Sequence, residues 1–237
     1  ERQLSSMVVH VMPAAVTLTL LVAFPGPQEA THTVPEALEL HVAPGGDDAW
    51  SGRLVAPSED GSDGPFATPA RAQRAVRFAI YSTRIAAPND DGDSSVGAKN
   101  LTGDWYRGAV FWDMEMYQLP LLAAIAPELA RNHILYRPRR LDAARTLAAQ
   151  DGYGGARFPW HSFRSGLEEP PAIGGQAYQQ LHLNAAVPSG ILHYHALTGD
   201  DETTLSAGLK VLIEQCRFWA SRATADGDGC YPVRGIC

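Results

Sequence analysis

A short stretch near the middle of the chain combines an indole ring with two carboxylates. Trp112 and Asp113 are adjacent, and Glu115 follows with only Met114 between the acids. The apolar face of an indole can stack on a sugar ring, and carboxylates accept hydrogen bonds from sugar hydroxyl groups. A buried tryptophan beside an acidic helix N-terminus is the alternative. The spacing alone leaves both interpretations open.

The segment that would position these residues has the spacing of an amphipathic helix. One face is predicted to bury against a core, at Phe111, Met114, Gln118, Leu121, Leu122 and Ile125. Trp112 and Glu115, three residues apart, would then share the neighbouring face. Asp113 would lie in the first turn, where the helix dipole favours a carboxylate.

Several motifs occur in one order along the chain. They are Gly97-Ala98-Lys99, Gly103-Asp104-Trp105-Tyr106-Arg107-Gly108, Phe111-Trp112-Asp113-Met114-Glu115, Asp142-Ala143-Ala144-Arg145, Gly152 to Trp160, and Arg217 to Arg222. In this order they resemble the catalytic domain of glycoside hydrolase family 65, which includes phosphorylases of maltose, trehalose and kojibiose and some hydrolases. The resemblance covers about residues 77–237.

The resemblance implies a mainly α-helical fold, an incomplete (α/α)6 barrel preceded by a short strand and turn segment. It implies an inverting enzyme acting on α-glucosyl disaccharides or oligosaccharides, with no cofactor and with inorganic phosphate as co-substrate if the enzyme is a phosphorylase. A homodimer and a cytoplasmic location would be expected of the complete protein. Because part of the barrel is missing, an apolar face that later helices would cover is expected to be exposed.

The resemblance also assigns roles to residues. Trp112, Asp113 and Glu115 would form the glucose-binding wall, with Trp160 and Arg107 as further candidates. His161 stands where the family usually has a carboxylate or amide, and Gln180 and Ala186 replace two acidic positions.

No residue of this chain is assigned as catalytic. In the family, the strand that corresponds to the last residues here leads into a GPDEY motif whose glutamate is the general acid, and the phosphate-binding residues lie downstream. Cys237 ends the chain before that motif. The 237 residues alone are therefore expected to be inactive.

Composition excludes some other classes of function. The net charge is −7 and no extended basic patch is present, which argues against binding to nucleic acid. The one basic cluster, Arg137 with Arg139 and Arg140, is predicted to lie on a solvated helix face. The cysteines Cys216, Cys230 and Cys237 follow no metal-ligand spacing and are taken as free thiols. No metal site is predicted.

Residues 1–30 contain a signal-like segment. The apolar run from Ala14 to Phe24 is too short to span a bilayer as a helix but has the length of a signal-peptide core. A buried strand or helix is the alternative. No stable membrane span is predicted, and the protein would be secreted only if this segment is a true signal peptide.

Residues 31–76 resemble the N-terminal cap of secreted pectate-lyase-like β-helix proteins. A strand near Leu38 to Val42 is followed by turns, and a helix is predicted from Pro69 to about Ile85 with Thr68 as its cap. The alternative function is therefore a secreted β-helix polysaccharide lyase or a carbohydrate-binding module. The repeated rungs that a β-helix needs are absent after Arg77. The chain is interpreted as a composite that joins this cap to a partial catalytic domain at residue 77.

Three further helical segments are predicted. One runs from Pro127 to Gln150 with an interruption at Pro138, and one from Ala177 to Leu197 ends at Gly199. The last, Glu202 to Arg222, is predicted to bury a stripe at Leu205, Leu209, Leu212, Ile213, Cys216 and Trp219. His133 is interpreted as a hydrogen-bonded core histidine rather than a ligand.

Overall fold

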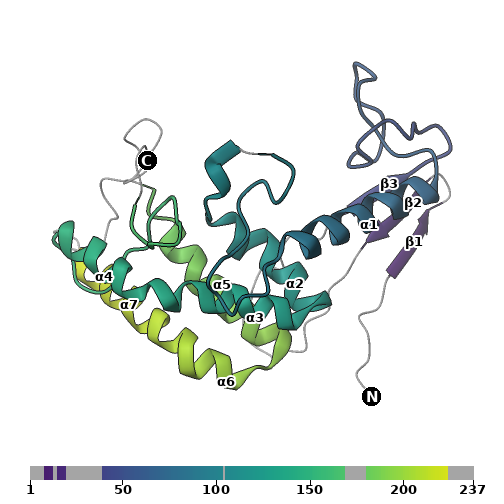
Figure 1. The fold of residues 1–237 in the computed structure, drawn as a ribbon. Helices are drawn as coiled ribbons and strands as arrows, with labels where there is room; N and C mark the ends of the chain where they lie inside the picture. The colour runs from purple at the N-terminus through teal and green to yellow at the C-terminus, as the bar shows by residue number, and fades with distance from the viewer. Residues whose placement is uncertain (1–7, 13–14, 20–38, 104, 169–179, 224–237) are drawn as a thin grey trace. The chain divides into compact units, whose positions relative to one another are not determined.

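The computed structural model describes residues 8–12, 15–19, 39–103, 105–168 and 180–223 (Figure 1). The chain divides into two compact units, Glu1–Tyr81 and Ser82–Cys237.

The first unit contains a three-stranded antiparallel sheet in the order β1-β2-β3. The strands are β1 (Val8–Met12), β2 (Ala15–Thr19) and β3 (Glu39–Val42). Val11 pairs with Val16, and Leu18 pairs with Leu40. Part of the signal-like run, residues 15–19, is therefore a paired strand, and residues 20–30 lie outside the described part. The antiparallel pairing differs from the parallel rungs of a β-helix.

A small apolar core joins β3 to the helix that follows. Leu40, Val42, Phe66 and Ala72 are buried together. The Phe66 N–H donates to the His41 carbonyl at 2.8 Å, which places the ring beneath the strand. Gly52 adopts a φ of +73° against this ring, and a Cβ there would lie 2.4 Å from a ring carbon.

Helix α1 (Pro69–Ala86) confirms the helix predicted from Pro69. Thr68 Oγ1 accepts from the Arg71 N–H at 3.2 Å, and Pro69 occupies the first position, where no N–H is needed. The predicted junction at residue 77 lies inside this continuous helix and stays a prediction.

The second unit is mainly helical, as expected (Figure 1). Its elements are η1 (Trp105–Gly108), η2 (Met114–Gln118), α2 (Leu119–Ile125), α3 (Pro127–Tyr136), η3 (Pro138–Arg140), α4 (Leu141–Gln150), α5 (Leu183–Thr198), α6 (Asp201–Thr203), η5 (Thr204–Gly208) and α7 (Leu209–Arg222). The break predicted at Pro138 is confirmed as the short 3₁₀ turn η3 between α3 and α4.

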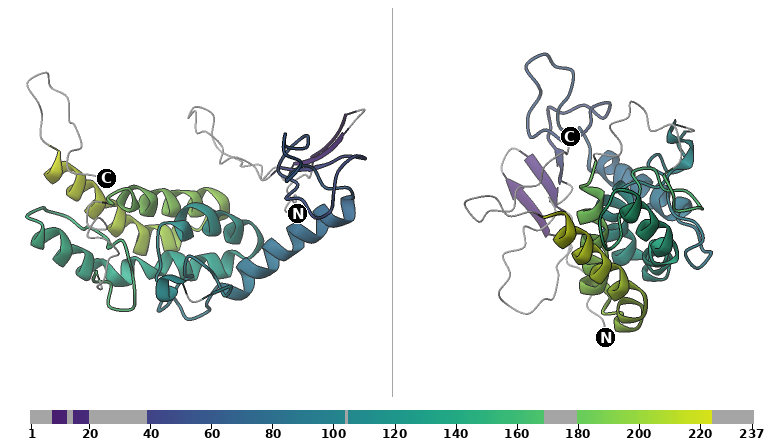
Figure 2. Two further views of the ribbon diagram at one scale, coloured as in Figure 1. Left: turned by 90° about the horizontal axis from the view of Figure 1, so that it is seen from above. Right: turned by 90° about the vertical axis from the view of Figure 1, so that its left-hand side faces the viewer.

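Helix α5 ends where the sequence predicts. Gly199 has a φ of +65°, and its N–H donates to the His195 carbonyl at 2.8 Å. Pro188 lies within this helix, and Leu183, Val187 and Ile191 on it are buried in the main core. Helix α2 contacts both α3 and α5, so these three helices form the centre of the unit (Figure 2).

The predicted buried stripe of the last helix is wrong. Leu205, Leu209 and Ile213 are 61%, 42% and 43% exposed, and Cys216 is an exposed free thiol. Leu212 and Trp219 are partly buried. The buried residues are instead Thr203, Thr204, Gly208, Val211, Glu214, Gln215 and Phe218. Leu205 of η5 and Leu209 and Ile213 of α7 are therefore exposed on the side that the prediction placed in the core.

Candidate functional site

Three separate segments of the chain lie side by side and build the candidate site. The Ala98 N–H donates to the Ala109 carbonyl at 3.3 Å. Val110 and Ser162 exchange both backbone hydrogen bonds, at 2.9 and 3.1 Å, as an isolated antiparallel bridge. These contacts fix the segment after Gly108 between the other two, so side chains from all three face one space.

That space is an open pocket of about 340 Å³. Pockets of this size are ordinary sites for small ligands. Trp112, Asp113 and Trp160, which the sequence predicts as sugar-binding residues, all line it. The complete lining is Ala98, Lys99, Tyr106, Phe111, Trp112, Asp113 and Trp160. Three of the five predicted residues are therefore brought together.

Aromatic rings form most of the wall. The Phe111 ring meets Trp160 edge to face, with centroids 5.5 Å apart. His182, the residue before α5, meets both Trp112 and Trp160 edge to face at 5.1 Å. His182 therefore bridges the two indoles that the sequence assigns to the pocket. Sequence reasoning did not assign His182 to the pocket, because Trp112 and Trp160 lie 70 and 22 residues away from it. The signal that could have found it is the segment from Gln180 to Ala186, which contains it and was compared with the family.

Lys99 and Tyr106 also line the pocket without having been predicted as site residues. Both belong to motifs that carry the family resemblance, which is the signal that could have found them. Lys99 places a cation on the same pocket as the carboxylate of Asp113. The site can therefore both donate hydrogen bonds to a polar ligand and accept them.

Arg107 does not line the pocket. It is exposed and lies in η1, where Tyr106 and Arg107 both have positive φ values of +64° and +54°. Successive left-handed residues other than glycine are uncommon. The turn they form directs Tyr106, rather than Arg107, to the pocket.

Glu115 is not on the pocket wall, which corrects the predicted placement beside Trp112. Its side chain is 3% exposed, and Oε1 lies 2.5 Å from Nε of Arg137. Its Cβ packs against Gly190 of α5, where an added Cβ would lie 3.0 Å away. Met114–Gln118 forms a π-helical turn, which widens the backbone and changes the face on which later residues lie.

The predicted solvated basic cluster is also wrong for two of its three members. Arg137 and Arg140 are 2% and 6% exposed. Arg140 stacks on the Tyr136 ring at 3.7 Å and donates to the carbonyls of Gly92, Asp93, Tyr136 and Phe163. Burial lowers the pKa of the Arg140 guanidinium from its ordinary value. Only Arg139 is half exposed, beside Asp91.

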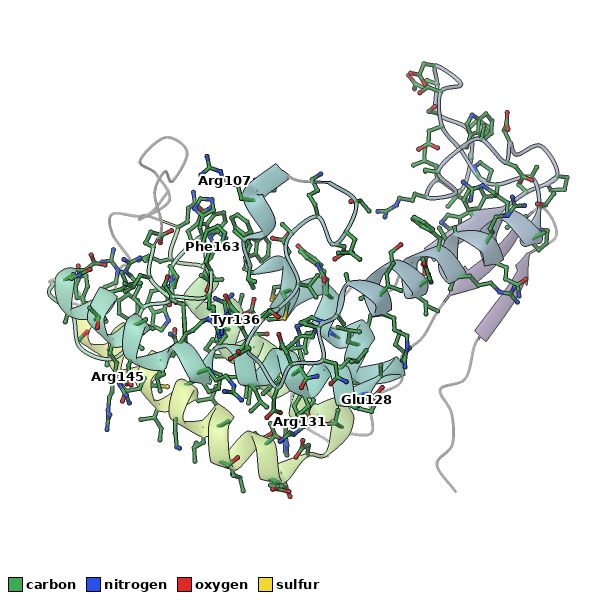
Figure 3. The ribbon with its side chains drawn as sticks, viewed as in Figure 1. Arg107, Glu128, Arg131, Tyr136, Arg145 and Phe163 are labelled. Carbon is green, nitrogen blue, oxygen red and sulfur yellow. The ribbon has the colours of Figure 1, made fainter. Side chains whose placement is uncertain are left out.

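The Tyr136 hydroxyl extends this network to the pocket loop. It contacts Ser162 Oγ at 2.9 Å and donates to the Phe163 carbonyl at 3.0 Å. Figure 3 labels Tyr136 near the middle of the helical unit and Phe163 above it. Arg140 and Tyr136 therefore hold the segment that carries Trp160 through hydrogen bonds to Ser162 and Phe163.

His133 is a core histidine, as predicted. It is 1% exposed, and its Nδ1 lies 2.8 Å from Ser95 Oγ. Burial lowers its pKa to about 4, so the ring is neutral near pH 7. Among the described residues, no group of three or more His, Cys, Asp or Glu side chains could hold a metal ion. No helix in the same part is long and apolar enough to cross a membrane.

Comparison with known proteins identifies one family. Residues 77–237 match the model of the glycosyl hydrolase family 65 central catalytic domain. The match begins at the residue where the motif resemblance begins.

Curated relatives carry several related names. The chain is 40% identical over 162 residues to a kojibiose phosphorylase of Halothermothrix orenii, covering 63% of this chain and 21% of that protein. It is 38% identical over 177 residues to a trehalose 6-phosphate phosphorylase of Lactococcus lactis, covering 69% and 23%. It is 35% identical over 166 residues to a kojibiose hydrolase of Flavobacterium johnsoniae, covering 70% and 24%. The chain thus spans between a fifth and a quarter of the length of these relatives.

A solved structure supports the same assignment. It is provisionally named as a kojibiose phosphorylase from human microbiome, has a TM-score of 0.60 and 30% identity, and covers 66% of this chain and 21% of that one. The expected fold, a mainly helical and incomplete (α/α)6 barrel, is confirmed. The chain belongs to glycosyl hydrolase family 65 and contains part of its central catalytic domain.

Proposed function

We propose that this chain supplies one wall of the glucose-binding site of an inverting phosphorylase that acts on α-glucosyl disaccharides. The observation that carries the proposal is the pocket in which Trp112, Asp113 and Trp160 meet. Relatives named as phosphorylases of kojibiose and of trehalose 6-phosphate support this class of substrate.

The chemistry of the wall fits a sugar ring. The indoles of Trp112 and Trp160 offer apolar faces for stacking, while Asp113 can accept from two hydroxyl groups and Lys99 can donate. Arg107 stays a weaker candidate, because its exposed turn is next to the lining residue Tyr106. Glu115 would not contact the sugar directly, because its carboxylate is paired with Arg137. Its effect on the sugar would come through the position of the backbone that carries Trp112 and Asp113.

Inverting cleavage needs an acid to protonate the leaving oxygen and a nucleophile on the opposite face of the sugar. In a phosphorylase inorganic phosphate is the nucleophile: it bonds to the anomeric carbon as the bond to the leaving oxygen breaks. No resident cofactor enters this reaction. Within the described residues, Asp113 is the one carboxylate on the pocket, and we assign it to sugar hydroxyls rather than to the acid role.

Hydrolysis is the second candidate reaction, with water in place of phosphate. The similarity to a kojibiose hydrolase supports this second reaction. The alternative of a β-helix lyase or carbohydrate-binding module is not favoured, because the family match covers residues 77–237 and the sheet of the first unit is antiparallel. For the complete protein we propose a cytoplasmic location and a homodimer, which cell fractionation and light scattering would test.

Sugar binding to the purified chain tests the proposal. Kojibiose, maltose or trehalose should change the intrinsic fluorescence of the wild-type chain with a saturable dependence on concentration. Trp112→Ala should abolish the change. Trp50→Phe, which alters a tryptophan of the first unit, is the matched control and should leave the change intact. A sugar response that persists unaltered in Trp112→Ala would contradict the proposed site.

A further inference from the structure

The loop that carries Trp160 is held by a buried carboxylate that no sequence motif singles out. The side chain of Glu168 is 3% exposed. The Trp160 N–H donates to its Oε2 at 2.8 Å, and the His161 N–H donates to its Oε1 at 3.0 Å. Both oxygens of one carboxylate therefore bind two successive backbone N–H groups.

Charged and hydrogen-bonding groups surround this carboxylate. Arg157 Nη1 lies 3.9 Å from Oε2, and His161 Nδ1 lies 3.6 Å from Oε1. Arg157 is itself 4% exposed and pairs with Asp151 at 2.5 Å. Two backbone N–H donors and a guanidinium therefore face the two oxygens of Glu168, which holds the carboxylate in one place.

The two hydrogen bonds fix the backbone on either side of the Trp160 Cα. One residue beyond His161, the Ser162 backbone pairs with Val110, next to Phe111 on the pocket wall. The peptide that carries Trp160 is thus held by Glu168 and by the Val110 bridge. The indole of Trp160 is then placed against Phe111 and His182 before any ligand arrives.

We propose that Glu168 is a positioning residue that sets the Trp160 wall of the sugar site. It does not touch the sugar and acts through the N–H groups of Trp160 and His161. The expected effect of Glu168 on sugar affinity rests on the proposed function. Its effect on the placement of the Trp160 indole stands whether or not sugar binds.

The central variant is Glu168→Gln. It keeps the shape of the side chain but replaces one acceptor oxygen with an NH2 group, which cannot accept from a backbone N–H. In the full chain labelled with ¹⁵N-tryptophan and without sugar, the Trp160 indole resonance should move while that of Trp50 stays. Affinity for kojibiose should fall about tenfold, because the pocket must then order its own wall on binding.

The matched control is Glu214→Gln. Glu214 also has a largely buried carboxylate, 9% exposed, that pairs with Arg145 and Arg217 and does not line the pocket. Its loss should lower the urea midpoint but leave the Trp160 resonance and the kojibiose affinity unchanged. This comparison separates positioning from general destabilisation.

Glu168→Asp provides a second variant should the glutamine variant fail to fold. It keeps the charge but is shorter by one carbon, and it should move the Trp160 resonance and weaken affinity by a smaller factor. If the wild-type chain binds no sugar, the proposed function fails, while the indole shift in the free chain still tests the role of Glu168. An unmoved Trp160 resonance in a folded Glu168 variant would overturn the inference, as would equal losses of affinity in the Glu168 and Glu214 variants.

Discussion

Glu115 and Arg137 form an ion pair inside the helical unit, with Oε1 and Nε 2.5 Å apart and both side chains at most 3% exposed. Arg137 also donates to the Phe111 carbonyl at 3.4 Å and lies over the Phe158 ring. The pair therefore joins the turn that follows Trp112 to the end of α3 and to the segment before Trp160. It supports both sides of the pocket from within the core.

Removing one member of this pair should destabilise the fold strongly. Arg137→Ala or Glu115→Ala leaves a buried charge without its partner, and the expected loss is about 3–5 kcal/mol in the free energy of unfolding. Urea denaturation measures it. Glu128→Gln is the control, because the Arg84–Glu128 pair is 52% and 62% exposed and should contribute less than about 1 kcal/mol. Equal effects of Glu115→Ala and Glu128→Gln would contradict the buried placement.

Asp113→Asn should weaken sugar binding without a comparable loss of stability. Asp113 is half-buried on the pocket wall, and a hydrogen bond to a charged group contributes about 1.5–3 kcal/mol, or about 10- to 150-fold in affinity. Calorimetric titration with kojibiose measures the loss. Asp142→Asn, at an almost fully exposed carboxylate on α4, should leave the affinity unchanged. Unaltered affinity in Asp113→Asn would remove this carboxylate from the sugar site.

Stability should depend on pH through His133. Its pKa is lowered from 6.5 to about 4 by burial, so the unfolded chain binds more protons than the folded chain between these values. The contribution is fully present above about pH 6.5 and is lost as the pH falls toward 4, on the order of 3 kcal/mol in total. His133→Gln should flatten the pH dependence of the urea midpoint over this window. An unchanged slope in His133→Gln would contradict the prediction.

The last helix provides a direct test of which face is buried. Val211→Ala should cost about 2 kcal/mol, because Val211 is fully buried. Leu209→Ala, two residues away on the exposed face, should change stability by less than about 0.5 kcal/mol. Thermal or urea unfolding distinguishes the two. A larger loss of stability for Leu209→Ala than for Val211→Ala would contradict this burial and would support the buried stripe predicted from the sequence.

The 237-residue chain should bind sugar without turning it over. Within the described part of the pocket the one carboxylate is Asp113, and a positioned general acid contributes about 10²–10⁴-fold to rate. Release of glucose 1-phosphate from kojibiose, maltose and trehalose, with phosphate present, should not exceed that of a heat-killed sample. Release above that level, abolished by Glu168→Gln or Glu115→Gln, would show that one of these residues is the acid.

Local signals predicted several limits of the helices, although α5 begins at Leu183 rather than at the predicted Ala177. Pro69, Pro127 and Pro138 mark starts or breaks, and Gly199 marks an end, because each acts on the backbone at its own position. The pocket residues Trp112, Asp113 and Trp160 were found through motifs in a common order. These features need no knowledge of distant contacts.

The two mispredicted faces have different causes. The five-residue π-helical turn at Met114–Gln118 shifts the helical period, so the buried residues Leu119 and Ala126 follow the predicted Gln118 and Ile125 by one position. In the last helix the buried residues Thr204, Gly208, Val211, Gln215 and Phe218 keep one helical spacing, displaced by one position from the predicted stripe along its whole length. The partners of Glu115 and Glu168 were missed for another reason: their contacts depend on Arg137, 22 residues away, and on backbone N–H groups that carry no sequence signal.

The most direct test of the sugar site is a titration of the ¹⁵N-tryptophan-labelled chain with kojibiose, followed through the five indole resonances. The resonances of Trp112 and Trp160 should move together and saturate, while those of Trp50 and Trp219 stay fixed, and Asp113→Asn should shift the response to higher sugar concentration. Resonances of Trp112 and Trp160 that stay fixed while Trp50 or Trp219 moves, or five resonances unmoved at saturating sugar, would contradict a glucose site on this wall.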